Sequence, residues 1–219
     1  MGRSRDDHQA GAAEGHPIFA ALYDQCGGPA EQTWMGRRRE RLLEGARGKV
    51  LEVGGGTGAN LPHYRDVDRV IVTEPDPSMR KRLVRKLASA RVPVEVSAAG
   101  AEELSFPDGS FDTVVSTLVL CTVPEQASAL EEIWRVLVPG GRLLFIEHVR
   151  AAGSMARWQD RMEPLWRRLF GGCHPNRDTV AAIREAGFEI ETFESFHPPV
   201  LLAGLTPHVQ GSAIVRHAA

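Results

Sequence analysis

The chain has few of the residues that stabilise secreted, metal-binding or membrane proteins. It contains three cysteines, Cys26, Cys121 and Cys173, an odd number with no CxxC pair among them. This spacing excludes a disulfide framework and a zinc finger, so we expect a reduced, cytoplasmic protein without a metal site. No apolar run approaches the ~20 residues that a membrane span requires. We therefore expect no membrane-spanning segment.

An excess of charge of one sign is also lacking. The 219 residues carry 26 basic and 28 acidic side chains and a formal net charge of −2. Without a basic excess there are no counterions to release from a nucleic acid, so no nucleic-acid partner is expected. Residues 1–15 are polar and predict a disordered tail, and residues 16–219 predict one globular domain. The sequence does not specify an oligomeric state.

Extended and helical segments alternate along the chain, which predicts α/β architecture. One helical pattern, at 76–90, follows the second extended run, and another, at 124–138, follows the fourth. A fifth run comes next, and two more runs lie near the C-terminus. Alternation of this kind requires right-handed crossovers and a mainly parallel sheet, and the last two runs suit an antiparallel edge pair. The sequence thus predicts a doubly wound, Rossmann-like sheet of seven strands at 50–53, 70–73, 92–97, 111–117, 142–148, 188–196 and 212–216.

Two segments lie outside this alternation. Residues 16–48, arginine-rich at 29–46, are expected to form N-terminal lid helices. Residues 150–178 are expected to form a helical cap, with a helix that Pro164 should kink. Three interpretations of this helix stay open: a lid over an apolar acceptor, a membrane-surface helix, or core packing. Its apolar stripe consists of Met155, Trp158, Met162, Trp166 and Leu169, opposite Arg157, Arg161, Arg167 and Arg168.

The most informative segment follows the first predicted strand. Its glycines allow positive φ angles and let a ligand approach the main chain. We expect a helix to open directly after the turn and to aim free N–H groups at the ligand. Glu74, twenty residues past Gly54, ends the second strand, where a carboxylate can accept both ribose hydroxyls. The turn contains Gly54, Gly55, Gly56 and Gly58.

Two nucleoside cofactors fit this turn. Gly54-x-Gly56-x-x-Ala59 satisfies the dinucleotide fingerprint, which is weak evidence by itself. Three features favour S-adenosylmethionine: the acidic Glu52 inside the strand, the tighter spacing Gly54-x-Gly56-x-Gly58, and a chain too short for a dinucleotide domain plus a catalytic domain.

An ordered set of motifs at 52–58, 74–76, 101–108 and 137–141 resembles those of class I methyltransferases. Within that class, residues 19–213 resemble the methyltransferase-like seven family, the mammalian thiol methyltransferases, and its bacterial relatives. More specific marks are the segments at 22–24, 58–60, 117–121, 147–148, 172–173 and 207–208. The resemblance implies methyl transfer from S-adenosylmethionine to the sulfur of a small thiol, with S-adenosylhomocysteine as product.

This chain departs from the family in three respects. It lacks the hydrophobic anchor of the mammalian proteins, which implies a soluble enzyme. Gly100 stands where many class I enzymes have an aspartate that contacts adenine, so the main chain of 99–101 and the side chain of Glu102 would replace that contact. Gly55 replaces a cysteine common in the family, an exchange expected to be neutral at a turn that faces the ligand.

The resemblance and the strand ends together assign candidate site residues. Glu52 would hold the cofactor's ammonium group, Glu74 its ribose, and Tyr23 would cover it from the lid. His148 and His174 are the candidate proton acceptors, each with a structural role as the alternative. Cys121 is expected to be a buried small hydrophobe. The full cofactor-binding set is Tyr23, Glu52, Gly54, Gly55, Gly56, Gly58, Asn60, Glu74, Pro75, Met79, Gly100, Ala101, Glu102, Thr117 and Leu118.

Two other functions stay open. Residues 101–112 also resemble the ubiquinone and menaquinone methyltransferases, so a C- or O-methyltransferase acting on a quinone, lipid-like or natural-product acceptor is the first alternative. A catalytically inert protein that binds S-adenosylmethionine is the second. A thiol acceptor needs little help from a base, because an alkyl thiol ionises with a pKa near ~8.5.

Overall fold

The computed structural model describes residues 33–199 and 206–216 of the chain. Three predictions fall outside the described residues. They are the tail at 1–15, the lid at 16–48 as far as residue 32, and the role of Tyr23. The part of the lid that is described contains one helix, α2 (Trp34–Leu43).

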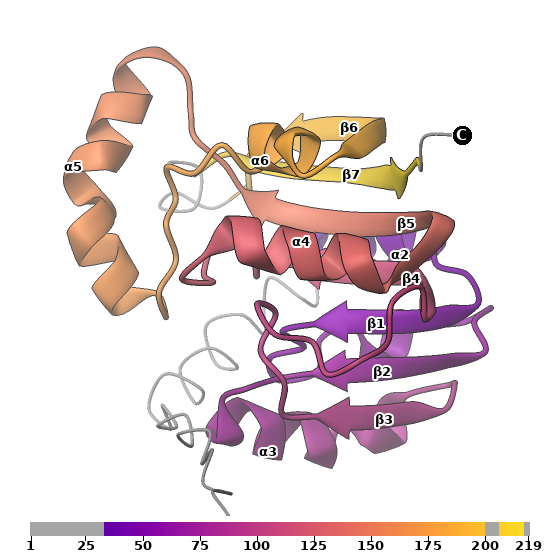
Figure 1. Cartoon of the computed structure of the whole chain (residues 1–219). Coiled ribbons are helices and arrows are strands. Elements are labelled where there is room, and N and C mark those ends of the chain that lie inside the picture. Colours follow the sequence, from indigo (N-terminus) through magenta and orange to yellow (C-terminus); the bar gives the residue numbers. More distant parts are fainter. Residues whose placement is uncertain (1–32, 200–205, 217–219) are drawn as a thin grey trace, which may run out of the picture.

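The predicted seven-stranded, mainly parallel sheet is confirmed. The strand order is β3-β2-β1-β4-β5-β7-β6, so the chain starts at the centre and winds outward in both directions (Figure 1). The first five strands pair in parallel, and β7 runs antiparallel to both of its neighbours, β5 and β6. The strands are β1 (Lys49–Val53), β2 (Arg69–Thr73), β3 (Val94–Ser97), β4 (Phe111–Thr117), β5 (Leu137–His148), β6 (Phe188–Phe196) and β7 (His208–Val215).

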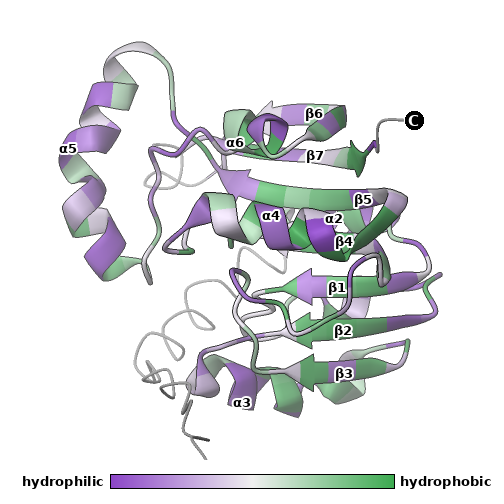
Figure 2. Cartoon of the chain, viewed as in Figure 1, coloured by the Kyte–Doolittle hydropathy of each residue, from purple (hydrophilic) through white to green (hydrophobic). Residues whose placement is uncertain are grey.

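Helices cover both faces of the sheet, because alternate residues of the inner strands are apolar on both sides. Leu51 and Val53 of β1 belong to the core beneath α4 (Gln126–Val136) and α6 (Thr179–Glu185). Val50 belongs to the opposite core, together with residues of α2, α3 (Pro77–Arg85) and the short helix η1 (Leu61–His63). Figure 2 shows the apolar strands between these layers. Glu52, with the parity of Val50, therefore points into the α2 side.

Several element boundaries differ from the sequence prediction, and one expected helix is not formed. β5 begins at Leu137, where we expected the helix to continue, because Leu137 pairs with Phe111 across a register shift. β7 begins at His208, where it pairs with His148 of β5. The glycine turn is followed by further turns and by η1, in which Pro62 occupies an early position, and not by the expected α-helix. In the described part of the chain, no α-helix therefore begins directly after this turn.

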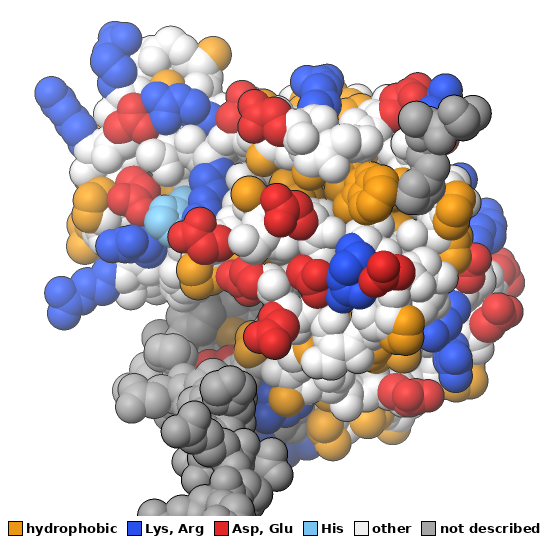
Figure 3. Space-filling view, in the orientation of Figure 1, with side chains coloured by type: hydrophobic (Ala, Val, Ile, Leu, Met, Phe, Trp, Pro, Cys, Tyr) orange, Lys and Arg blue, Asp and Glu red, His pale blue; other side chains and the backbone are white. Residues whose placement is uncertain are grey.

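The cap helix α5 (Gly153–Leu169) stands to one side of the sheet, next to the ends of β5 and β7 (Figure 1). It continues as one helix through Pro164. The face it buries carries Ala156 and Gln159, whereas Met155 and Trp158 of the expected stripe are exposed. Basic side chains gather over this side of the molecule (Figure 3). Core packing of the whole stripe, one of the three interpretations, is therefore wrong, and the lid and membrane-surface interpretations stay predictions. Within the described ranges, no helix is long and apolar enough to cross a bilayer.

Candidate active site

The turn after β1 is open to a ligand at one glycine. Gly54, Gly56 and Gly58 all have positive φ angles, of 60°, 56° and 83°. A Cβ atom at position 54 would lie 2.6 Å from Val119, and one at position 58 would lie 2.9 Å from Leu61. At Gly56 nothing lies within 4 Å of the position that a Cβ would take. Gly54 and Gly58 therefore permit close packing, and Gly56 exposes main chain to a bound molecule.

Gly55 faces the core and not the ligand, in contrast to the prediction. Its N–H donates to the carbonyl oxygen of Thr73 at the end of β2, at 2.8 Å. A Cβ here would overlap Cγ1 of Val72 and lie 3.0 Å from Cδ1 of Leu83. The residue closes the packing between β1, β2 and α3, so exchange to a larger residue is not neutral in this chain.

Glu74 links the glycine turn to the start of α3. Its Oε2 accepts the N–H of Gly56 at 2.7 Å, and its Oε1 accepts the N–H of Asp76 at 2.9 Å. Burial raises the pKa of this carboxyl group, and the two backbone hydrogen bonds oppose that shift. A carboxylate has about four lone-pair sites, so each oxygen can accept one further hydrogen bond. Glu74 thus lies beside the glycine turn with lone pairs to spare, and its role as the ribose acceptor stays a prediction.

The adenine-side candidates lie on two neighbouring loops. Asp76 caps α3 by accepting the N–H groups of Ser78 and Met79, at 2.7 and 3.0 Å. Pro75 precedes this cap, and Met79 is buried in the first turn of the helix. The second loop follows β3 and carries the other candidates, Gly100, Ala101 and Glu102, of which Ala101 is buried.

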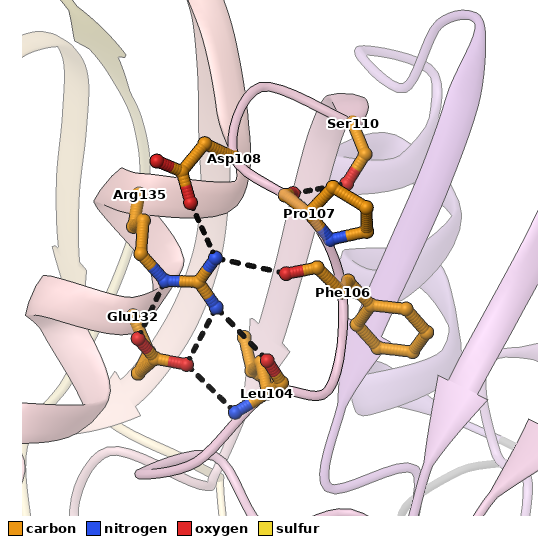
Figure 4. Close-up of polar contacts among 7 residues, drawn as sticks. All are labelled: Leu104, Phe106, Pro107, Asp108, Ser110, Glu132 and Arg135. Carbon is orange, nitrogen blue, oxygen red and sulfur yellow. Dashed lines mark hydrogen bonds and ion pairs between the residues drawn. The ribbon is translucent and has the colours of Figure 1, made fainter.

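Arg135 on α4 anchors the chain just beyond that second loop (Figure 4). Its guanidinium donates to the carbonyl oxygens of Leu104 and Phe106 and to the carboxylates of Asp108 and Glu132. Glu132 in turn accepts the N–H of Leu104 at 2.7 Å. These ion pairs lower the pKa of Glu132 and raise that of Arg135. The acidic motif at 101–108 therefore has a fixed backbone.

A buried polar network lies behind the glycine turn. Asn60 donates to Glu52 Oε1 at 3.0 Å and to Thr117 at 3.1 Å. The hydroxyl of Tyr64 donates to Glu52 Oε2 at 2.7 Å. Arg39 donates to Asn60 at 2.9 Å and to Thr117 at 2.8 Å. Each oxygen of Glu52 is thus engaged within the protein, and a contact with an ammonium group would use its remaining lone pairs.

Sequence reasoning missed two members of this network, Arg39 and Tyr64. Both are almost fully buried. Arg39 shares a helix face with Met35, Leu42 and Leu43, so its position on the apolar side of α2 was the signal that could have identified it. Nothing in the spacing of Tyr64 indicates its partner.

The buried carboxyl group of Glu52 has an unusual proton affinity. Desolvation raises its pKa to about 7, although hydrogen bonds from Tyr64 and Asn60 and the charge of Arg39 oppose the shift. The group therefore exchanges its proton near neutral pH.

The predicted cofactor-binding residues Thr117 and Leu118 lie at the end of β4, where ligands of open α/β sheets bind and the methyl donor is expected. The backbone is strained at this point. Leu118 has φ of 61°, the left-handed region that favours glycine, and its N–H donates to Ile146 at 2.7 Å. The following backbone is held by the buried carboxylate of Glu147, which accepts the N–H groups of Val119 and Leu120 at 3.1 Å and of Cys121 at 3.2 Å. Strain of this kind persists only where the surroundings enforce it, as they do here.

His148 lies in a cluster with two cysteines. Its Nδ1 is 3.1 Å from Sγ of Cys173 and 3.6 Å from Sγ of Cys121, and the two sulfur atoms are 3.7 Å apart. The hydrogen bond between the two thiols, followed by the one with His148, lowers the pKa of Cys173 to about 5, while the pKa of Cys121 is raised. The ring of His208 lies 4.2 Å from that of His148.

The second histidine candidate has a different environment. Nδ1 of His174 lies 2.8 Å from Oε1 of Glu163 on α5, and its backbone N–H donates to Cys121 at 2.7 Å. Burial and the charge of Arg177 lower its pKa, so the ring is neutral over a wider pH range. His174 ties the cap to the loop after β4.

Comparisons with known proteins point to one family. The methyltransferase domain family matches residues 51–145. Human thiol S-methyltransferase TMT1A is 40% identical over 201 residues, which are 90% of this chain and 82% of that protein. Human thiol S-methyltransferase TMT1B is 41% identical over 78% of this chain and 73% of its own length.

A solved structure shows the same fold at low identity. Geranyl diphosphate C-methyltransferase from Streptomyces coelicolor, solved with S-adenosyl-L-homocysteine, superposes with a TM-score of 0.66 at 14% identity. The match covers 82% of this chain and 77% of that chain. At this identity the likeness supports the fold alone.

Proposed function

Because the chain belongs to the thiol S-methyltransferase family, within the class I methyltransferases, we propose that it transfers a methyl group from S-adenosylmethionine to the sulfur of a small thiol. The observation that carries this proposal is the pairing of Glu74 with Gly56. A buried carboxylate with free lone pairs lies beside a glycine whose outer side is open.

The described residues fit this cofactor. When bound, S-adenosylmethionine supplies an electrophilic methyl group on a positively charged sulfur. Glu74 would accept the ribose hydroxyls, and the open main chain at Gly56 would lie under the methionyl part. Residues 100–102 would border the adenine, and Arg135 anchors the chain just beyond them at Leu104 and Phe106. Tyr23, outside the described residues, is proposed to cover the cofactor.

The acceptor side is proposed to lie between the carboxyl end of β5 and the cap. His148 ends that strand, and Cys173 and His174 follow α5. A thiol acts as a nucleophile once it loses its proton, and alignment of the reactants supplies most of the rest of the acceleration, ~7–11 kcal/mol in favourable cases. Carbon and hydroxyl acceptors would need a stronger base, and the relatives' names do not favour them.

An acceptor panel tests the proposal. The purified chain is incubated with S-adenosylmethionine and alkyl thiols, hydrogen sulfide, phenols, quinols or amines, and release of S-adenosylhomocysteine is followed with mass detection of the methylated acceptor. We expect thioether products, with rates that follow the thiolate fraction as pH rises towards the acceptor's pKa. Methylated quinols or phenols without thioethers would overturn the proposal, and binding without turnover of any acceptor would favour an inert binding protein.

A matched pair of variants tests the cofactor site. Glu74→Gln keeps the shape but removes the charge, and should weaken S-adenosylmethionine binding by about 10-fold or more, because hydrogen bonds to an ionised group are the strong ones. Glu95→Gln, on the exposed side of β3, serves as the control. Equal affinities in calorimetry would remove Glu74 from the proposed site.

A further inference from the structure

Three potential metal ligands that are distant in sequence meet at one point. Cys121 follows β4, His148 ends β5, and Cys173 follows the cap helix α5. Their ligand atoms all lie within 4.8 Å of one another. Cys121 and Cys173 are buried, and His148 is half-buried. Two thiols and an imidazole are the ligands that zinc prefers.

The distances within this cluster are close to those of a tetrahedral zinc site. Ideal zinc–ligand bonds place two sulfur atoms about 3.8 Å apart, and a sulfur and a nitrogen about 3.6 Å apart. The two sulfur atoms here are 3.7 Å apart, and Cys121 Sγ lies 3.6 Å from His148 Nδ1. The third edge, from Cys173 Sγ to the same nitrogen, is 3.1 Å, so it would lengthen by about 0.5 Å on metal binding.

Hydrogen bonds hold the backbone of both cysteines in place. The buried carboxylate of Glu147 accepts the N–H of Cys121. The N–H of Cys173 donates to Phe170 at 3.1 Å, and the N–H of the next residue, His174, donates to the carbonyl of Cys121 at 2.7 Å. The two cysteine-bearing loops are thus tied to each other through the main chain, which keeps the two thiols close together.

Among the described residues, three side chains offer ligand atoms at this point. A tetrahedral ion held by three protein ligands keeps one position for water or substrate, which is the arrangement of catalytic zinc sites. Cys121 lies three residues beyond Leu118, where the methyl donor is expected. An acceptor sulfur on the free position would therefore be bound beside the cofactor site.

We propose that Cys121, His148 and Cys173 bind a zinc ion, and that the fourth position of this ion takes the acceptor as a thiolate. The second part rests on the proposed function. The acceptor thiol releases its proton to solvent on binding. Its sulfur then forms the new bond to the methyl carbon while the bond from that carbon to the sulfonium sulfur breaks and leaves its electron pair on S-adenosylhomocysteine. The neutral thioether is a weaker ligand than a thiolate, so it dissociates.

Metal content tests the first part without reference to activity. The full chain is produced in zinc-supplemented medium and purified without chelator. Inductively coupled plasma mass spectrometry should then find about one zinc ion per chain. Cys121→Ser, Cys173→Ser and His148→Gln should each lose most of this zinc. Cys26→Ser is the matched cysteine control and should keep it. A wild-type protein without zinc that also takes up none on dialysis against zinc salts would overturn the proposal, and so would a Cys121–Cys173 disulfide in protein purified under reducing conditions.

Cobalt substitution of the wild-type protein tests the geometry even if the variants fold poorly. Tetrahedral Co²⁺ with two thiolates should give intense visible bands and a sulfur-to-cobalt charge-transfer band. Adding an alkyl thiol should change both, and adding its S-methyl product should not. Bands that do not respond to thiol would overturn the fourth-ligand part. Thioether formation by zinc-free protein would overturn the metal's role and leave the proposed function intact, whereas thiol-responsive bands without methyl transfer would keep the site and reject the function.

Discussion

The carboxyl group of Glu52 makes stability depend on pH near neutrality. Its pKa is about 7 in the folded protein and 4.5 in the unfolded reference. Because the folded state binds the proton more tightly, the stability from this group is fully present below pH 4.5 and is lost as pH rises through 7. We expect the free energy of unfolding to fall by about 2–3 kcal/mol between pH 5 and 8 through this group.

Urea unfolding of Glu52→Gln at several pH values checks this expectation. Glutamine keeps one oxygen that accepts from Asn60, offers an NH2 group that can donate to the Tyr64 hydroxyl oxygen, and does not titrate. The fall between pH 5 and 8 should therefore shrink. Glu95→Gln, at an exposed position, should retain the wild-type slope. An identical slope in Glu52→Gln would mean that this carboxyl group is ionised at pH 5.

Gly55 tests the packing between the glycine turn and the sheet. A methyl group at this position would overlap Val72, so Gly55→Ala should destabilise the fold by about 1–3 kcal/mol. The double variant Gly55→Ala with Val72→Ala provides the missing space, and should be less destabilised than the sum of the two single changes. Thermal unfolding of the four proteins measures this coupling, and strict additivity would show that position 55 does not contact Val72.

At the residue scale, the sequence indicated the position of Glu74 beside the glycine turn, but not the buried side chains behind that turn. Glu74 could be placed because a strand end and a glycine turn have a fixed spacing in this fold. Arg39 and Tyr64 could not, because their partners lie on other elements and any arginine on an arginine-rich helix is usually solvated. Position 55 was misread because a glycine shows no side chain whose direction could be inferred.

One buried polar side chain, Gln159, connects the cap helix α5 to the chain on both sides of it. The amide of Gln159 accepts the N–H of Ala151 at 2.8 Å and donates to the carbonyls of Val149 and Pro175, at 3.3 and 3.0 Å. Gln159→Leu would leave these buried groups without partners, at a cost of about 1–3 kcal/mol for each group that stays buried. We expect loosening confined to the cap and not unfolding of the sheet.

Hydrogen exchange of the Gln159→Leu protein measures this loosening. Amides in 150–178 should exchange faster than in the wild type, and those of β1 and β4 should not change. The KM for the acceptor should rise more than the dissociation constant of S-adenosylmethionine. Arg161→Gln, an exposed position on the same helix, is the control. Faster exchange throughout the sheet would show that Gln159 supports the whole fold.

At the element scale, the strands were predicted well, because their apolar runs report burial directly. The buried face of α5 was not predicted correctly. Its sequence shows an apolar stripe through Trp158, but the helix docks through the neighbouring Gln159, whose hydrogen bonds no periodicity can reveal. The start of β5 was also missed, because its pairing begins before the glycines at 140 and 141.

For the whole molecule, chain order and spatial order differ in ways that decide the site. Alternation predicted the parallel part of the sheet, but it did not indicate that His148 would lie beside both Cys121 and Cys173. The lack of a CxxC pair led us to expect no metal site, because cysteine spacing reports only on residues that are neighbours in sequence. Three elements that converge at the carboxyl end of β4 and β5 form a cluster that only the fold reveals.

Cofactor binding should stabilise the molecule as a unit, because the proposed site joins β1, β2 and the loops after β3 and β4. At 100 times its dissociation constant, S-adenosylhomocysteine should add about 2.7 kcal/mol, which raises the melting temperature of a chain this size by about 5–10 °C. Differential scanning fluorimetry measures the shift. Glu74→Gln should reduce it at fixed ligand concentration, and Glu95→Gln should not. A comparable shift with NADH, and none with S-adenosylhomocysteine, would assign the glycine turn to a dinucleotide.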